Sequence, residues 1–434
     1  MAADLSAHPR APQPAAAPAA NWSGFYLGGE FGFDFATAKY GRPQSSQSDI
    51  WIGSANRGLV GGVYAGFNYQ VMPWLVLGVE GDLSSSRAGY RELGADLDFF
   101  QATKYLAAFA GRVGIVIMPT TMVYAKAGPS WIDVRGVEGF GDTFNKTLRG
   151  GVLAVGIESL ITPNYTMRLE GSYTRASEAL LLNQSFDQYR PQIFQVMLGA
   201  AYKLDMPGLG VPASTAAAAP LFTKAAPAVA VPRWTGMEAG AFGSVNGDQM
   251  LYSGSAVGEN GQLGPFANLA IGGGGFLGLN VALYPNLVVG AEVSANFQKA
   301  DFNEATGVGF APRMVHFASI SEIYALSLRF GWLATPNTLF YLKTGPAWIR
   351  VTPDANYWNA VAPNTATQPV TVDGYQYGGG AETYLTSNLS LRIEGIYTAS
   401  SNTPGQLTFQ GIQPTPFKLK PSLLTTTLGA AVHF

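Results

Sequence analysis

The chain of 434 residues is apolar at 47% but charged at only 12%, about half the charge of an ordinary soluble domain. No run of about 18 apolar residues occurs, which argues against helical membrane spans and leaves a closed β-barrel as the fold that satisfies every backbone group in lipid. The formal net charge of −2 gives no basic field for nucleic acid, and zero cysteines exclude disulfides and thiolate metal sites.

Residues 1–20, MAADLSAHPRAPQPAAAPAA, form a Pro/Ala-rich tail ahead of the first periodic segment. The stretch AADL is typical of the residues that remain after signal cleavage at a small-residue site. We therefore expect an exported chain whose tail lies in the periplasm.

The segment FYLGGEFGFDF, from residue 25 onward, alternates large apolar side chains with Tyr26, Glu30 and Asp34. This period of two predicts a strand with one apolar face and one polar face. The pattern recurs up to QIFQVMLGAAYKL near residue 204 and predicts about eight strands, each long enough to cross a bilayer when tilted. The second half repeats the pattern from WTGMEAGAFGS to SLLTTTLGAAVHF.

The connections between these strands alternate in length. MPW, MPTT and ITPN are tight turns, as are YPN, ATPN and LTSN in the second half. The intervening polar loops are longer and cover about 37–57, 84–103, 133–146, 175–191, 246–266, 298–321, 352–373 and 400–421. Short turns at one end and long loops at the other indicate an outer-membrane barrel. A soluble up-and-down barrel is the alternative, but a dry interior would exclude the charges of the polar face.

One phrase is written twice, as YAKAGPSWI at 124–132 and YLKTGPAWI at 341–349. A Pro/Ala-rich segment at 206–233 separates the two copies. We predict an all-β fold of two transmembrane, antiparallel up-and-down barrels of eight strands each, at 21–205 and 234–434, joined by this periplasmic linker. The alternative is one sixteen-stranded barrel, wide enough to act as a diffusion porin for small hydrophilic solutes.

The segments NWSGFYLGGEFG, GGVYAGFNYQ, VLGVEGDL, GRVGIV and ITPNYTMRLEGSYT resemble, in this order, the small outer-membrane β-barrel family of alphaproteobacteria, often labelled porin-like surface antigens. The resemblance covers nearly the whole first copy and, more loosely, the second. It implies an eight-stranded barrel in the bacterial outer membrane with both termini in the periplasm. The tandem duplication departs from the family's usual single barrel.

The chain ends in Phe434, after apolar residues at alternating positions. This ending resembles the terminal-strand signal of outer-membrane barrels, which implies the barrel-assembly machinery as a partner beside outer-membrane lipid. Tryptophans near strand ends predict an interfacial aromatic girdle, formed by Trp22, Trp74, Trp131, Trp234 and Trp348.

Strand parity places a repeated set of charges on the polar, inward face of each barrel. The set is Glu80, Arg112, Lys126, Glu158, Arg168 and Glu170, with Glu292, Arg329, Lys343, Glu382, Arg392 and Glu394 as its second copy. Three acids and three bases in each barrel predict a lumen that neutralises itself. We interpret the set as a salt-bridged plug, or alternatively as the selectivity lining of a narrow channel.

Other chemistry finds little support, and we expect neither an enzyme nor a bound cofactor or metal. The G-x-G-x-x-G in GGGGFLG lies within a predicted strand and lacks the following helix that a phosphate site needs. His8, His316 and His433 are scattered along the chain. The long loops GRPQSSQSDIW and PDANYWNAVAPNTATQPV are candidates for binding a surface ligand. The sequence thus predicts a structural or surface-contact protein with largely closed lumens.

Overall fold

The computed structural model describes residues 21–41, 52–86, 89–94, 97–137, 143–177, 180–181, 188–205, 234–253, 262–306, 313–356, 368–401 and 418–434. In this part of the chain no helix is both long and apolar enough to cross a membrane. The predicted tail 1–20, the linker 206–233 and the loop segments proposed to bind a ligand lie wholly or largely outside the described residues.

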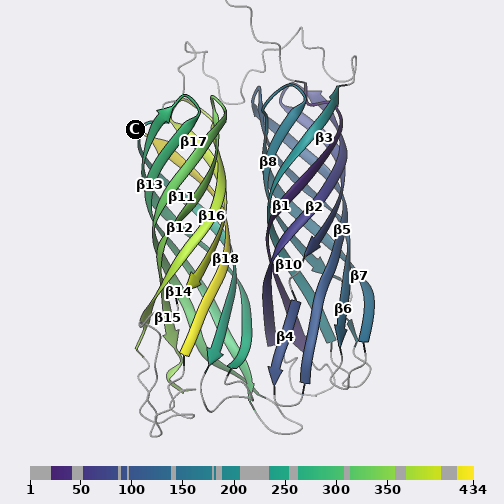
Figure 1. The fold of residues 1–434 in the computed structure, drawn as a ribbon, viewed down its shortest axis with the longest axis vertical. Coiled ribbons are helices and arrows are strands. Elements are labelled where there is room, and N and C mark those ends of the chain that lie inside the picture. Colours follow the sequence, from purple (N-terminus) through teal and green to yellow (C-terminus); the bar gives the residue numbers. More distant parts are fainter. Residues whose placement is uncertain are drawn as a thin grey trace, which may run out of the picture.

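The first half of the chain forms a closed antiparallel ring of strands, shown in purple to teal in Figure 1. Its main strands follow one another around the ring, and β1 pairs with both β2 and β10, which closes it. Two short strands extend it, because β4 pairs with β5 and β9 with β10. The strands are β1 (Gly24–Gly41), β2 (Ile52–Met72), β3 (Leu75–Ser86), β4 (Gly89–Gly94), β5 (Leu97–Met118), β6 (Thr121–Val137), β7 (Thr143–Leu160), β8 (Tyr165–Ala176), β9 (Leu180–Leu181) and β10 (Gln188–Asp205).

The second half forms another ring, in which β11 pairs with both β12 and β18. Its strands are β11 (Gly236–Ser253), β12 (Gln262–Tyr284), β13 (Leu287–Thr306), β14 (Arg313–Thr335), β15 (Thr338–Pro353), β16 (Val370–Tyr384), β17 (Leu389–Ser400) and β18 (Lys418–His433). Each ring has eight main strands, so the prediction of two eight-stranded barrels in tandem is confirmed. The sixteen-stranded alternative is wrong, because β10 pairs back onto β1. Among the described residues, a single backbone bridge between Ser54 and Phe266 pairs a strand of one ring with a strand of the other.

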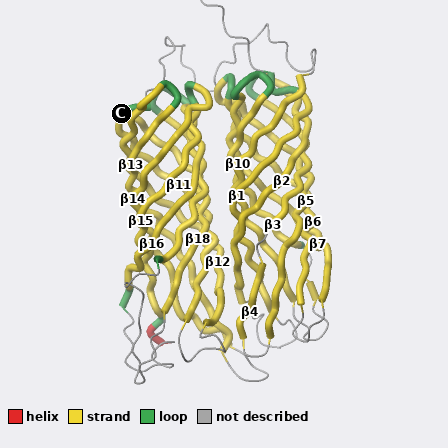
Figure 2. Tube along the Cα trace, in the orientation of Figure 1, coloured by secondary structure: helices red, strands yellow, loops and turns green. Residues whose placement is uncertain are grey.

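Side chains alternate across each barrel wall as the period of two requires. On β1, Phe25, Leu27 and Phe31 are 50%, 65% and 67% exposed, whereas the intervening Tyr26 is 5% exposed. Short turns gather at one end of both barrels in Figure 2, the end at which the C-terminus lies in Figure 1. The long connections therefore leave the barrels at the opposite end.

The repeated Trp-Ser/Thr-Gly start of each copy has a structural reason. Gly24 and Gly236 open the first strand of each barrel with φ of 138° and 145°, a backbone conformation that favours glycine. A Cβ at Gly24 would overlap the carbonyl oxygen of Leu204, and one at Gly236 would lie 2.5 Å from that of Phe434. The glycine thus lets the chain enter the ring beside its own last strand.

The tryptophans just before these glycines correct the girdle prediction. Trp22 and Trp234 are only 1% and 4% exposed, and each packs inside the mouth of its barrel. Trp22 is held there by a hydrogen bond from its backbone N–H to Gln70 Oε1 at 3.1 Å, and the Trp234 indole donates to the Pro336 carbonyl at 3.0 Å. The girdle assignment is therefore wrong for these two, because the chain before each first strand turns inward over the mouth.

The other three girdle candidates lie where lipid can reach them. Trp131 and Trp348 are 40% and 37% exposed on the outer wall, and Trp74 is partly exposed at a short turn. Their interfacial role stays a prediction.

The barrels stand side by side (Figure 1). They meet along what we call the seam, which includes β1, β2, β6, β7, β8 and β10 of the first barrel and β12, β15, β16, β17 and β18 of the second. Thr121 and Thr338 are equivalent in the duplication, and their Oγ1 atoms form a hydrogen bond of 2.9 Å across the seam. Each bonds a further hydroxyl in its own barrel at 3.0 Å, Ser159 and Thr383 respectively. Equivalent residues in contact indicate a pseudo-two-fold axis between the barrels.

In the middle of the seam, equivalent residues of the two barrels again make equivalent contacts. A Cβ at Gly171 would lie 3.0 Å from Thr426 of the second barrel, and one at the equivalent Gly395 would overlap Val196 of the first. Both glycines thus allow close approach of the two walls. Towards the long-loop end, Arg57 donates to Ser422 Oγ at 2.8 Å across the seam. The two copies therefore pack through the same face, as the subunits of a symmetric dimer do.

Candidate functional site: the charged lumens

The twelve charges predicted from strand parity all point into the barrels. Each is between 0% and 4% exposed, and the ion pairs bring together six from each barrel. Neighbouring strands contribute them at nearly the same height, because antiparallel pairing sets Glu158 opposite Arg168 and Arg112 opposite Lys126. The plug or lining role of the set stays a prediction.

In the first barrel, Glu80 is the central acceptor. Its Oε1 receives Lys126 Nζ at 2.6 Å and its Oε2 receives Arg168 Nη1 at 2.7 Å. Glu170 takes a second contact from Lys126 at 2.9 Å, and Arg112 is paired with Glu158. Tyrosines support the cations: the Arg112 guanidinium lies 3.7 Å from the ring centre of Tyr124, and Arg168 lies 3.4 Å from that of Tyr64.

The second barrel repeats this arrangement with Glu292 at its centre. Lys343 pairs with Glu292, and Arg392 Nη2 lies 2.5 Å from Glu292 Oε2 and 2.6 Å from Glu394 Oε1. Arg329 Nη2 meets Glu382 Oε2 at 2.7 Å. Buried pairs of this kind are strongly interdependent, because the loss of one partner leaves an uncompensated charge in a low-dielectric interior.

Sequence reasoning missed three acids that join these networks. Glu30 meets Arg168 at 2.8 Å, Asp82 meets Lys126 at 2.9 Å, and Glu238 pairs with Arg329. The described ion-pair networks thus hold five carboxylates in the first barrel and four in the second, each against three permanent cations. The predicted count of three acids in each network is therefore too low, and the self-neutralising lumen stays a prediction. The signal was present, since Glu30 and Asp82 share the strand parity of Tyr26 and Glu80.

Apolar layers lie beside the charges, on both sides in the second barrel and at the short-turn end in the first. At the short-turn end, Trp22 packs with Val76, Val116, Met122, Tyr124 and Leu160 in the first barrel. Towards the long-loop end of the second barrel, fourteen buried residues form a continuous apolar cluster that includes Met250, Phe302, Ile349 and Leu419. Between this cluster and the charges a cavity of about 30 Å³ remains, bordered by Lys343 and Glu394. That is room for about one water molecule.

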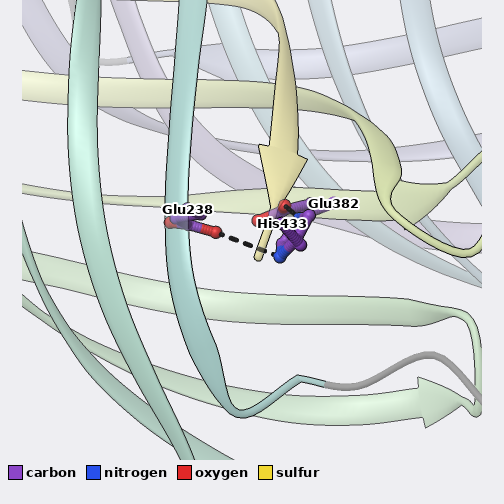
Figure 3. Close-up of side chains that lie close together, drawn as sticks. All are labelled: Glu238, Glu382 and His433. Atoms are coloured by element: carbon purple, nitrogen blue, oxygen red, sulfur yellow. Dashed lines mark hydrogen bonds and ion pairs between the residues drawn. The ribbon is translucent and has the colours of Figure 1, made fainter.

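At the short-turn end of the second barrel, the same network extends to His433 (Figure 3). The imidazole Nε2 of His433 lies 3.0 Å from Glu382 Oε1, and its Nδ1 lies 3.8 Å from Glu238 Oε2. These three side chains offer ligand atoms within 4.8 Å of one another. Sequence reasoning treated His433 as a chance placement, because its partners lie 51 and 195 residues away in the chain. Only closure of the ring brings β11, β16 and β18 together.

Comparison with known proteins identifies outer-membrane relatives. The sequence model of the outer membrane protein beta-barrel domain matches the chain twice, over residues 7–201 and 214–415. The 31 kDa outer-membrane immunogenic protein of Brucella melitensis biotype 1 is 31% identical over 224 residues, which are 47% of this chain and 92% of that protein. The 22 kDa outer membrane protein of Rhizobium leguminosarum bv. viciae is 31% identical over 164 residues, 36% of this chain and 65% of that protein.

Solved structures that align with part of this chain include two outer-membrane or surface proteins. Neisserial surface protein A is 18% identical and aligns with 42% of this chain and 98% of its own, with a TM-score of 0.27. The attachment invasion locus protein of Yersinia pestis is 14% identical and aligns with 42% of this chain and 99% of its own, with a TM-score of 0.26.

Proposed function

This chain belongs to the outer membrane protein beta-barrel family and lies in the bacterial outer membrane. We propose that it is an integral outer-membrane protein of two packed barrels, whose two lumens are largely closed to solutes. Its role is structural or one of surface contact. The observation that carries this proposal is the filling of each lumen: buried ion pairs across the middle, with apolar layers beside them. Eight strands leave an interior that side chains can fill.

The seam supports a role as a paired unit. Two barrels that pack through a shared face present one continuous outer wall to lipid and carry two sets of long loops on the same side. The Brucella relative is named an immunogenic protein, which supports exposure of such loops at the cell surface. A surface ligand held by the loops is part of the proposal.

The proposal assigns the chain no catalytic chemistry. Acid–base catalysis needs a carboxylate that is free to exchange a proton with substrate. The lumenal carboxylates are instead held by cations: Glu80 meets Lys126 and Arg168, while Glu292 meets Arg392 and Lys343. Such groups serve better as internal cross-links than as acids or bases.

Single-channel conductance of the full-length protein in a planar bilayer tests the proposal. We expect silence or small flickering steps, with a general diffusion porin as the positive control for insertion and recording. A matched variant removes bulk from the apolar layer of the second barrel, as Phe302→Ala with Leu419→Ala, and is expected to conduct more than the wild-type protein. A large, stable current from the wild-type protein would refute the closed lumens and support the alternative, a selective channel lined by the charges.

A further inference from the structure

The cluster of Glu238, Glu382 and His433 has the composition of a metal site. Glu238 stands at the start of β11, Glu382 on β16 and His433 at the end of β18 (Figure 3). Two carboxylates and one imidazole are a common ligand set for Zn²⁺ and similar divalent ions. One imidazole nitrogen and one oxygen from each carboxylate lie within 4.8 Å of one another, so a single small cation can reach all three side chains after a small adjustment.

Arg329 holds both carboxylates in the orientation that a metal would need. Its guanidinium forms ion pairs with Glu238 Oε1 and, at 2.7 Å, with Glu382 Oε2. Each carboxylate therefore turns its other oxygen, Glu238 Oε2 and Glu382 Oε1, towards the imidazole. Contacts of this kind orient the ligands of natural metal sites. Ser390 Oγ, 3.0 Å from His433 Nε2, can hold the ring if Nδ1 binds the ion.

An unsatisfied oxygen points into the same space. Glu238 is 1% exposed, and its Oε2 is buried without a hydrogen-bond partner. A buried carboxylate oxygen left unpaired is costly. The network around it also holds four carboxylates against three permanent cations. A cation between Glu238, Glu382 and His433 would remove the cost of the unpaired oxygen.

The first barrel lacks this arrangement, although the two networks are otherwise alike. The equivalent positions hold Tyr26, Glu158 and Lys203. Tyr26 donates to Glu80 at 2.8 Å, and Lys203 Nζ donates to the Asn21 carbonyl at 2.6 Å. An ammonium group thus stands where the second barrel has an imidazole, and a phenol stands where it has a carboxylate. The metal-type ligand set is specific to the second barrel.

We propose that Glu238, Glu382 and His433 bind one divalent transition-metal ion, of which Zn²⁺ is the best match. The ion joins the first strand of the second barrel to its last, β11 to β18, and both to β16. It enters from the short-turn mouth, where 8% of the His433 side chain is exposed beside Trp234 and Tyr384. The site clamps the ring at the place where it closes.

Calorimetric titration of the purified full-length protein, stripped with a chelator and titrated with ZnCl₂ alone, tests this site. We expect one ion per chain. His433→Gln and Glu238→Gln should each weaken binding at least about 10-fold, since even the loss of a group that only orients a ligand has an effect of this size. His316→Gln, which alters the other described histidine, is the matched control and should bind as the wild-type protein does. Titration with Co²⁺, followed by its visible absorption, reports directly on coordination by the imidazole.

Two results would overturn the proposal. One is the absence of Zn²⁺ binding by the wild-type protein. The other is unchanged binding in both His433→Gln and Glu238→Gln, which would place the ion elsewhere. Because either variant could fold poorly, the unfolding midpoint is measured with and without ZnCl₂. The ion should raise the midpoint of the wild-type protein and of His316→Gln, since it binds only the folded barrel, and should leave a folded His433→Gln unchanged.

Discussion

Replacing Arg112 with alanine is expected to destabilise the first barrel by about 3 to 5 kcal/mol, the cost of breaking a buried ion pair by removing one partner. Arg112 is 2% exposed and is paired with Glu158, which is 3% exposed. Its guanidinium also lies 3.7 Å from Glu80 and 3.7 Å from the ring centre of Tyr124. Truncation therefore leaves Glu158 buried without its cation and removes a stacking contact.

The assay is guanidinium unfolding of the protein in phospholipid vesicles, followed by tryptophan fluorescence. With a slope of about 4 kcal/mol per M, the loss corresponds to a midpoint about 1 M lower. Arg149→Ala removes the same side chain from an exposed position on β7 and should change stability by less than about 0.5 kcal/mol. Because the two barrels can unfold separately, the shift should be confined to the first transition if two are seen.

A double-mutant cycle separates the ion pair from simple loss of bulk. Glu158→Ala alone leaves Arg112 with Glu80, and the double variant removes both charges. The double variant should cost about 2 kcal/mol less than the sum of the single changes, the coupling typical of buried charged neighbours. An unchanged midpoint in Arg112→Ala, or strictly additive costs, would refute the salt-bridged plug.

Two further predictions concern the seam and assembly. The chain has no cysteine. The double variant Thr121→Cys with Thr338→Cys should therefore form one disulfide under oxidation, because the two parent hydroxyls lie 2.9 Å apart. After cleavage at a protease site inserted in the linker, this disulfide should keep the two barrels joined. The pair Thr121→Cys with Leu279→Cys serves as control, and equal cross-linking of both pairs would contradict the seam. Deletion of Phe434 should lower the amount of protein in the outer membrane, measured by surface labelling, and wild-type levels would contradict its role as an assembly signal.

Much of this architecture follows from local sequence pattern. Alternation of side chains along a strand is a local property, so parity alone was enough to point Glu80, Arg112 and their ten companions into a lumen. The duplication is likewise visible in the chain, because equivalent residues such as Lys126 and Lys343 stand in matching phrases. Strand lengths and turn positions, marked by prolines in the short turns, complete the prediction of a membrane barrel.

Tertiary structure decided what depends on distant partners. Ring closure pairs β18 with β11 and so brings His433 close to Glu238 and Glu382. The spacing of these residues along the chain does not predict this contact. The inward turn of Trp22 depends on the width of the mouth beneath it, which the other strands determine together. Tertiary structure also decided between two barrels and one wide barrel. Backbone hydrogen bonds are the same for every strand, so they do not specify that β10 pairs with β1 rather than with a strand of the second half.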